Sequence, residues 1–491
     1  MVHSLLQRKL TRRQVLASAA LGGAAVVLAS CGPTTIEKTV VVEKEKVVTA
    51  TPVPTKPPEP AVLDVWWNTD VPEIGDLAKW ENDPENEIFK AKWYWGGLGA
   101  KMYLPWLDKH PGVSLNITSH SWDWDLRQNQ LMALAAGLVP DVSYGEAYVN
   151  EFVQLGVYNS VSDSVAQLFP EGSVRGAMVG GKAYGLPMSS GADVLFINLE
   201  MLDKAGLDRN KLPKTWDELV AVCQAISKVN NNDKWGNTCY YTYGPDPNTY
   251  GTAMRVLHWF NQNNAPLGDD LGVPSANVPG AAETWEFHNK LMWSSTEALI
   301  LQAESEAGSG QLFNDGIIAI KPGWNNDATS VGASNVDAAA IEFPIPAGGK
   351  PATIVIGNQI NSPLKGGKNP ELAISLVEET LADVEAQAFL ADNAGVWIPA
   401  LKSLLEQYPT YERLGGYKTE TAKTMVRVTM KALLEGGAGP LPGWPKNGSR
   451  IWADWNNAYQ RIWKGNLSKA DIQKELDTLQ TTIEGNLTKT G

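Results

Sequence analysis

The amino-acid sequence predicts an α/β fold of two domains, in which largely parallel sheets carry helices on both faces. The chain has 491 residues, more than one hydrophobic core usually organises. From residue 61 onward, short apolar runs alternate with amphipathic stretches, a rhythm typical of strands joined by helical crossovers. Apolar residues make up 43% of the chain and charged residues 19%, so a sizeable core is expected.

The first domain is expected to open with three strands separated by two helices. Strands are predicted over 61–67, over 113–117 and from residue 142, and helices over 103–110 and 127–137. The carboxyl ends of parallel strands share one edge of a sheet, where such folds bind ligands. Residues 68–70 and 143–146 should therefore meet at a common rim. Residues 71–101 do not follow this alternation of strands and helices. They are interpreted as an inserted loop that passes over this edge of the sheet.

The second domain is expected to repeat the α/β pattern. Thr215 is an N-cap candidate, and Glu218 three residues later completes a capping box. Strands are predicted over 193–197, 239–243 and 317–320, the last running on to Gly323, and helices over 215–229, 371–390 and within 449–483.

The first 30 residues have the features of an export signal. Basic residues and no acids precede an apolar run over 15–29, which is too short for a comfortable membrane span. Leu28-Ala29-Ser30-Cys31 then resembles the lipobox of bacterial lipoproteins, in which the cysteine is lipidated and becomes the first residue of the mature chain. Arg12 and Arg13 resemble a twin-arginine signal, but adjacent arginines also occur in ordinary basic signal regions.

Residues 31–60 are predicted to be the lipidated Cys31 followed by a spacer rich in proline and threonine. Proline fixes φ and lacks an amide donor, so this stretch should not pack as helix or sheet. The chain carries 41 basic and 54 acidic side chains, a formal charge of −13. This balance argues against nucleic acid as a partner.

Several segments, in order, resemble the extracellular solute-binding proteins of the family that includes maltodextrin-binding protein. They lie at 66–70, 136–142, 181–187, 195–198 with 202–207, 212–219 and 313–324. The resemblance implies a two-lobed, type II periplasmic-binding-protein-like fold of the Venus-flytrap kind with three interlobe crossings. The first lobe would combine 61–190 with 349–399, and the second 191–346 with 402–491.

The resemblance also implies a function. The protein would be a monomer that binds a sugar or oligosaccharide and delivers it to the membrane subunits of an ABC importer. A lipid on Cys31 would anchor it to the outer face of the cytoplasmic membrane. No cofactor and no metal is expected. Sugars present hydroxyls and C–H faces, which amide and carboxylate side chains and aromatic rings recognise, and the chain has 19 tryptophans.

The candidate ligand-binding residues follow predicted strand ends or lie near the implied crossings. Trp324 stands where the family has a stacking tryptophan, and Asn68 and Asp70 match its polar sugar contacts. Tyr144 and Glu146 occupy the rim where the family places an aromatic residue and an acid. The remaining candidates are Trp67, Tyr241, Tyr243, Asn325, Asn358, Gln359, Trp397 and Trp444. Each has an ordinary structural alternative, such as core packing for the aromatic residues and turns for the polar ones.

Three other functions remain open on the sequence alone. A glycoside-acting enzyme needs only two suitably spaced carboxylates, although the chain has no Gly-x-Ser-x-Gly elbow, no P-loop and no metal-ligand spacing among its five histidines. A surface adhesin or structural lipoprotein would need no closable cleft. A receptor for a polyamine or peptide would share the fold.

Only Cys223 and Cys239 remain once Cys31 is lipidated. They lie 16 residues apart, and in an oxidising compartment they are candidates for a disulfide. Two separately buried thiols are the alternative.

Overall fold

A computed structural model describes most of the chain after residue 59. The described residues are 60–68, 98–99, 101–120, 123–145, 149–232, 236–237, 239–240, 256–268, 273–293, 309–353, 355–356, 359–393, 395, 397–435 and 448–488. Every described residue belongs to one compact unit, Pro58–Gly491. The predicted export signal, Cys31 and nearly all of the spacer lie outside the described residues.

The first sheet has five strands in the order β2-β1-β3-β14-β6. Strand β1 runs parallel to both neighbours, pairing Val65 with Val142 of β3. In this sheet the predicted parallel arrangement is wrong at β14, which returns from far along the chain and pairs antiparallel with β3 and β6. The bounds are β1 (Ala61–Trp67), β2 (Val113–Ser119), β3 (Val142–Gly145), β6 (Leu186–Pro187) and β14 (Ile360–Pro363).

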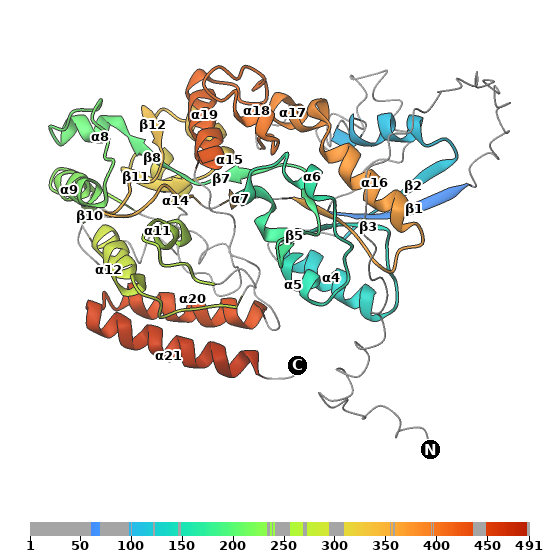
Figure 1. The fold of residues 1–491 in the computed structure, drawn as a ribbon. Coiled ribbons are helices and arrows are strands. Elements are labelled where there is room, and N and C mark those ends of the chain that lie inside the picture. Colours follow the sequence, from blue (N-terminus) through green and yellow to red (C-terminus); the bar gives the residue numbers. More distant parts are fainter. Residues whose placement is uncertain are drawn as a thin grey trace, which may run out of the picture. The chain divides into compact units, whose positions relative to one another are not determined.

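Helices pack against this first sheet (Figure 1). Helix α16 contacts β14 and β6. Residues 101–109 are helical, and the other helices are α4 (Asp123–Ala135), α5 (Val149–Gln154), α6 (Asp163–Ala166), α7 (Glu171–Val174), η1 (Arg175–Ala177), α16 (Pro370–Leu381) and α17 (Val384–Asn393).

The predicted single helix over 371–390 is wrong. The structure has two helices, α16 and α17, separated at Ala382 and Asp383. The Asp383 carboxylate accepts a hydrogen bond from the Ala386 amide at 2.9 Å. A capping aspartate stabilises the start of a new helix, and the apolar pattern alone does not reveal the break.

The second sheet has β8 at its centre, antiparallel to β11 and β12, so the predicted parallel arrangement is wrong for these three strands. Tyr240 adds a parallel bridge to Ile320. The predicted strand over 317–320 begins three residues late, because the amides of Ile317 and Ile318 instead donate to the Leu312 carbonyl and close helix α14. The bounds are β8 (Val194–Asn198), β11 (Ile320–Gly323), β12 (Ala338–Ile341) and α14 (Ser309–Asn314).

Helix α9 begins as the sequence predicts. The Thr215 side chain accepts from the Glu218 amide at 3.2 Å, and the Glu218 carboxylate accepts from the Thr215 amide at 3.0 Å. This reciprocal pair is the capping box, and it fixes the start of the helix locally. The structure gives α9 as Trp216–Ser227.

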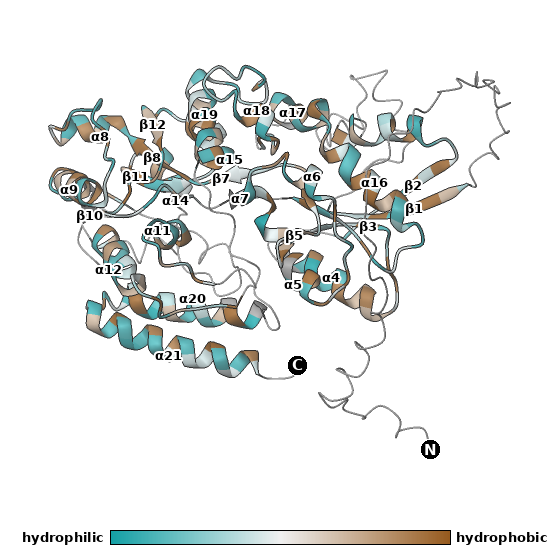
Figure 2. Cartoon of the chain, in the orientation of Figure 1, coloured by the Kyte–Doolittle hydropathy of each residue, from teal (hydrophilic) through white to brown (hydrophobic). Residues whose placement is uncertain are grey.

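The other helices near the second sheet come from several parts of the chain (Figure 1). Helix α15 packs on α19, and α12 packs on α20 and α21. Figure 2 shows hydrophilic and hydrophobic residues interleaved along α20 and α21, as expected for half-buried helices. The bounds are α8 (Leu199–Lys204), α11 (Leu257–Gln262), α12 (Ala281–Met292), α15 (Asn325–Ala333), α18 (Lys402–Leu405), α19 (Glu420–Glu435), α20 (Gly448–Lys464) and α21 (Lys469–Leu487).

Three short antiparallel pairs complete the described structure. They are β4 (Met178–Val179) with β5 (Lys182–Ala183), β7 (Gly191–Ala192) with β13 (Val355–Ile356), and β9 (Asn231–Asn232) with β10 (Gly236–Asn237). Among the helices in the described ranges, none combines the length and the apolar character that a membrane crossing requires.

Most tryptophan side chains that the structure describes are core residues. Trp216 stacks on Phe287 with ring centroids 3.9 Å apart, and Trp285 packs against Tyr459 at 4.9 Å. The buried tryptophans are Trp66, Trp67, Trp106, Trp216, Trp259, Trp285, Trp397, Trp455 and Trp463. Among the described residues, tryptophan is therefore mainly a core residue, and only individual positions can indicate a ligand.

His288 lies among the rings of this second core. Its neighbours include Tyr240, Trp285 and Tyr459, with ring centroids 5.8 to 6.1 Å away. Burial lowers the pKa of His288 from its ordinary value of 6.5 to about 3. Between these two pH values the unfolded chain binds a proton that the folded chain does not, so stability falls as the pH falls.

We expect His288 to account for about 3 kcal/mol of lost unfolding free energy at pH 4.5, because each pH unit below 6.5 contributes about 1.4 kcal/mol. Urea unfolding of His288→Leu at pH 7 and pH 4.5 measures this, and the difference between the two pH values should shrink. His110→Leu is the control, because the His110 ring is only partly buried. An unchanged pH difference in His288→Leu would contradict the assignment.

Candidate functional site

Polar residues gather at one edge of the first sheet. Strands β1 and β3 are parallel neighbours, so the chain leaves both at the same edge, as predicted. The antiparallel β14 starts there, since Ile360 pairs with both Gly145 and Pro187. This polar edge therefore joins Asn68, Gly145, Gln359 and the residues that follow Pro187.

Two amide side chains at the polar edge are buried without complete hydrogen bonding. Asn68 is 1% exposed, and neither its amide nitrogen nor its oxygen has a partner among the described residues. Gln359 is also 1% exposed; its oxygen accepts from the Ser189 hydroxyl at 3.1 Å, and its nitrogen has no described partner. A buried amide without a partner costs free energy, which a polar ligand would recover.

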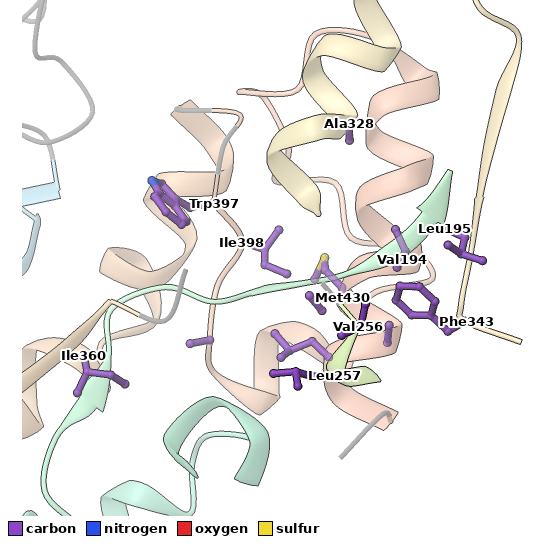
Figure 3. Close-up of a cluster of buried hydrophobic side chains, with 14 of the residues drawn as sticks. Val194, Leu195, Val256, Leu257, Ala328, Phe343, Ile360, Trp397, Ile398 and Met430 are labelled. Carbon is purple, nitrogen blue, oxygen red and sulfur yellow. The ribbon is translucent and has the colours of Figure 1, made fainter. Parts of the chain in front are cut away.

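The connector 187–193 brings distant segments to the polar edge. The Met188 amide donates to the Gln359 carbonyl at 2.8 Å, and the Ser190 amide donates to the Ile398 carbonyl at 3.2 Å. The Thr353 hydroxyl donates to the Asp193 carbonyl at 2.6 Å. Figure 3 shows Trp397 and Ile398 beside the chain that leads to Val194 and Leu195 of β8. Two returning parts of the chain therefore lie against one connector.

Two predicted tryptophans meet beside this connector. Trp324, which precedes α15, and Trp397 have ring centroids 5.2 Å apart at an interplanar angle of 64°. Trp324 is partly buried, and Trp397 is 7% exposed with no described partner for its indole N–H. The Thr329 hydroxyl, one turn into α15, donates to the Gly395 carbonyl. Aromatic faces and unpaired polar atoms thus lie close together.

Asn325 supports Trp397 rather than facing solvent. Asn325 is fully buried and shares a side-chain hydrogen bond with Tyr417. The Tyr417 hydroxyl in turn donates to the Trp397 carbonyl at 3.2 Å. Burial raises the pKa of Tyr417, so the phenol stays protonated and keeps donating. Sequence reasoning missed Tyr417, and nothing local to its sequence indicates this contact.

A buried ion pair holds the turn that carries Trp324. Lys321 Nζ lies 2.7 Å from Asp327 Oδ1, with side chains 0% and 11% exposed. The other oxygen of Asp327 accepts from the Trp324 amide at 3.0 Å. Gly323 is required in this turn, because an added Cβ would lie 2.5 Å from the Phe196 ring. The sequence offered one signal, an acid three residues after Trp324 at a helix start.

Two predicted ligand residues have rings that the structure places in the first core. Trp67 is fully buried and packs edge-on against Tyr103, with centroids 5.5 Å apart. Tyr144 is also fully buried, and its backbone carbonyl accepts a hydrogen bond from the side-chain amide of Gln130 at 2.6 Å. Both rings therefore pack in the core beneath the sheet that positions Asn68.

Six other predicted ligand residues lie outside the described residues. They are Asp70, Glu146, Tyr241, Tyr243, Asn358 and Trp444. Three of them directly adjoin described segments: Glu146 follows β3, Tyr241 follows Tyr240, and Asn358 precedes Gln359. Their contact with a ligand stays a prediction.

Two cavities in the described part of the chain lie elsewhere. One of about 260 Å³ is bordered by Phe169, Met178 and Lys402, and one of about 130 Å³ is bordered by Phe343 and Lys431. None of the predicted ligand residues lines either cavity. We favour the polar edge, because its buried amides lack partners and two aromatic rings stand beside it.

The side chains of Asn68, Gln359 and Ser189 give the polar edge neutral amides and a hydroxyl, the nearby rings are indoles, and the connector also carries the buried carboxylate of Asp193. The charges of Lys321 and Asp327, which hold the turn at Trp324, neutralise each other. Within the described ranges, no group of three or more histidine, cysteine or acidic side chains could hold a metal ion. Such a set of groups suits an uncharged ligand with many hydroxyls and a C–H face.

Comparison with known proteins places the chain among solute receptors. The family described as "Bacterial extracellular solute-binding protein" matches residues 82–395. A Brucella abortus binding protein is 24% identical over 189 residues, which is 38% of this chain and 44% of that protein. An arabinooligosaccharide-binding protein of Halalkalibacterium halodurans is 26% identical over 139 residues, 26% of this chain and 31% of its own length. The chain thus spans less than half the length of these curated relatives.

The fold matches solved structures over nearly their whole length. The cyclic alpha-maltosyl-1,6-maltose binding protein of Arthrobacter globiformis superposes with a TM-score of 0.62 at 16% identity. The match covers 86% of this chain and 99% of that one. At this identity the likeness establishes the fold alone.

Proposed function

Because the chain belongs to the bacterial extracellular solute-binding protein family, we propose that it is a receptor that binds a sugar or oligosaccharide and delivers it to an ABC importer. The polar edge is the observation that supports a sugar as the ligand. There, two buried amides have unpaired atoms, and the connector that bonds Gln359 through Met188 also bonds Ile398, the neighbour of Trp397 in the ring pair. Amides bind sugar hydroxyls, and aromatic faces cover sugar C–H surfaces.

The structural neighbours are two-lobed, type II periplasmic-binding-protein-like proteins of mixed α/β content, which confirms the predicted fold class. We assign the lobes as 61–190 with 349–399, and 191–346 with 402–491. Two separate sheets support this division: one is built from 61–187 and 360–363, and the other from 194–198, 320–323 and 338–341. Three interlobe crossings would then lie near 187–194, 344–349 and 399–403.

The proposed receptor closes its lobes around the ligand. A ligand that contacts both lobes binds the closed form more tightly than the open form, and this difference drives closure. Asn68 and Gln359 would contribute from the first lobe, and Trp324 from the second. The protein acts as a monomer and needs no metal or cofactor in this proposal.

Isothermal titration against mono- and oligosaccharides, with product analysis of each mixture, tests the function. We expect at least one sugar to bind, to be recovered unchanged, and to compact the protein in small-angle scattering. At 100 times its dissociation constant this ligand should add about 2.7 kcal/mol of stability. Cleaved sugar would instead indicate a glycoside-acting enzyme, and binding of a polyamine or peptide alone would reject the sugar assignment.

We also propose that Cys31 is lipidated and anchors the receptor to the outer face of the cytoplasmic membrane. The export signal over 1–30 and the proline-rich spacer over 31–60 support this anchor. Cys31→Ser removes the sulfur that carries the lipid, so metabolic labelling with a fatty acid should mark the parent protein and not the variant. Cys223→Ser is the matched control and should label normally. Equal labelling of Cys31→Ser would contradict lipidation at this position.

A further inference from the structure

Two cysteines from different elements of the second lobe lie in contact. Cys223 belongs to α9, and Cys239 lies in the segment that bridges to β11. Both side chains are fully buried, and their Sγ atoms are 2.8 Å apart as free thiols. A disulfide has a sulfur–sulfur distance of about 2.05 Å, so only a small shift separates this contact from a bond.

The surroundings favour a structural role for this pair. Both thiols are 0% exposed, which denies a substrate or an external oxidant access in the folded state. Burial, and then the contact with Cys223, raise the pKa of Cys239 well above its usual range. A reactive or redox-sensing cysteine needs the opposite, an exposed thiol with a lowered pKa.

We propose that Cys223 and Cys239 form a disulfide bond in the exported protein. The proposal goes beyond ligand binding and depends on export, since compartments outside the cytoplasm are oxidising. An oxidised small-molecule or protein disulfide supplies the oxidant. The Cys223 thiolate attacks one of its sulfurs and releases the first thiol. The Cys239 thiolate then attacks Cys223 Sγ and releases the second, so two electrons and two protons pass to the oxidant.

The bond would join α9 to the segment that pairs with the start of β11, the strand that leads to Trp324. The Cys239 carbonyl accepts from the amides of Ala319 and Ile320 at 2.9 and 2.8 Å. Ile320 opens β11, which ends at Gly323 beside Trp324. Because the thiols are inaccessible once folded, the bond closes during folding, and a reductant should open it only after denaturation.

Peptide mapping of the full-length protein after export tests the bond. Cells are quenched with N-ethylmaleimide before lysis, and the protein is denatured and digested with trypsin without reduction. Lys228 and Lys234 lie between the two cysteines, so trypsin separates their peptides unless a disulfide joins them. We expect one joined pair, two hydrogen atoms lighter than the separate peptides, with neither cysteine modified. Both peptides carrying N-ethylmaleimide would overturn the proposal.

Thermal unfolding of Cys223→Ala, Cys239→Ala and the double variant gives an independent readout. A disulfide closing a loop of this size should raise Tm by about 3 to 9 °C. Each single variant should lose this stabilisation, and the double variant should melt close to the single variants, because the bond can be lost only once. Additive losses in the double variant would indicate two independent thiols and overturn the proposal. Sugar affinity is measured in parallel on the same proteins. A failure of the proposed receptor function is then distinguished from the absence of the disulfide.

Discussion

Replacing Trp324 by alanine is expected to weaken sugar binding by about 1.5 to 4 kcal/mol while changing the stability of the unliganded protein much less. Trp324 directly follows β11, is partly buried, and its ring centroid lies 5.2 Å from that of Trp397. A stacking ring loses most of its water only when the sugar arrives, so its contribution should appear in binding. Isothermal titration gives the affinity, and urea unfolding without ligand gives the stability.

Trp285→Ala is the matched control in the same lobe. Trp285 is 1% exposed and packs between Phe260 and Tyr459, with centroids 5.3 and 4.9 Å away. Truncating such a core tryptophan should cost about 3 to 5 kcal/mol of stability. If Trp324→Ala lost stability to the same extent and kept its affinity, Trp324 would be a core residue and the ligand site would lie elsewhere.

Asp327→Asn is expected to lower the unfolding free energy by about 3 kcal/mol or more. The substitution leaves the fully buried Lys321 ammonium without its carboxylate, and an unpaired buried charge is costly. The amide oxygen of the new side chain can still accept from the Trp324 amide, which now donates to Asp327 at 3.0 Å. Sugar affinity should therefore fall less than in Trp324→Ala. Urea unfolding and isothermal titration measure the two effects.

The double variant Lys321→Met with Asp327→Asn isolates the ion pair. Removing both charges should return the stability to within about 1 kcal/mol of the parent, because no buried charge is left unpaired. Glu286→Gln is the control for an exposed ion pair. Lys290 and Glu286 are 58% and 36% exposed, and loss of this pair should lower the unfolding free energy by about 0.5 kcal/mol or less. A double variant as unstable as Asp327→Asn would mean that Asp327 acts through other contacts.

Local sequence determines much of the secondary structure. Strands β1, β2 and β3 are predicted in order because short apolar runs and turn residues encode strands within a few positions. The start of α9 is equally local, since Thr215 and Glu218 cap the helix from three residues apart. The split between α16 and α17 is missed because apolar periodicity continues across it, and only the Asp383 contact marks the break.

Sheet order depends on contacts that no local pattern carries. Ile360 of β14 pairs with Gly145 of β3, more than 200 residues earlier, and this returning strand interrupts the predicted parallel order. The burial of a side chain likewise depends on segments that are distant in the sequence. Trp67 and Tyr144 follow the rim pattern in sequence, but their rings lie in the core once the first sheet is packed.

The sequence by itself determined the fold class, the family and the position of Trp324, because strand and helix periodicity and short ordered motifs are written along the chain. Only the tertiary structure decided that Trp324 faces Trp397, that Lys321 and Asp327 are buried together, and that Gln359 keeps an unpaired nitrogen. The physical reason is that burial and hydrogen-bond satisfaction depend on every segment that packs around a side chain, and these segments come from distant parts of the sequence.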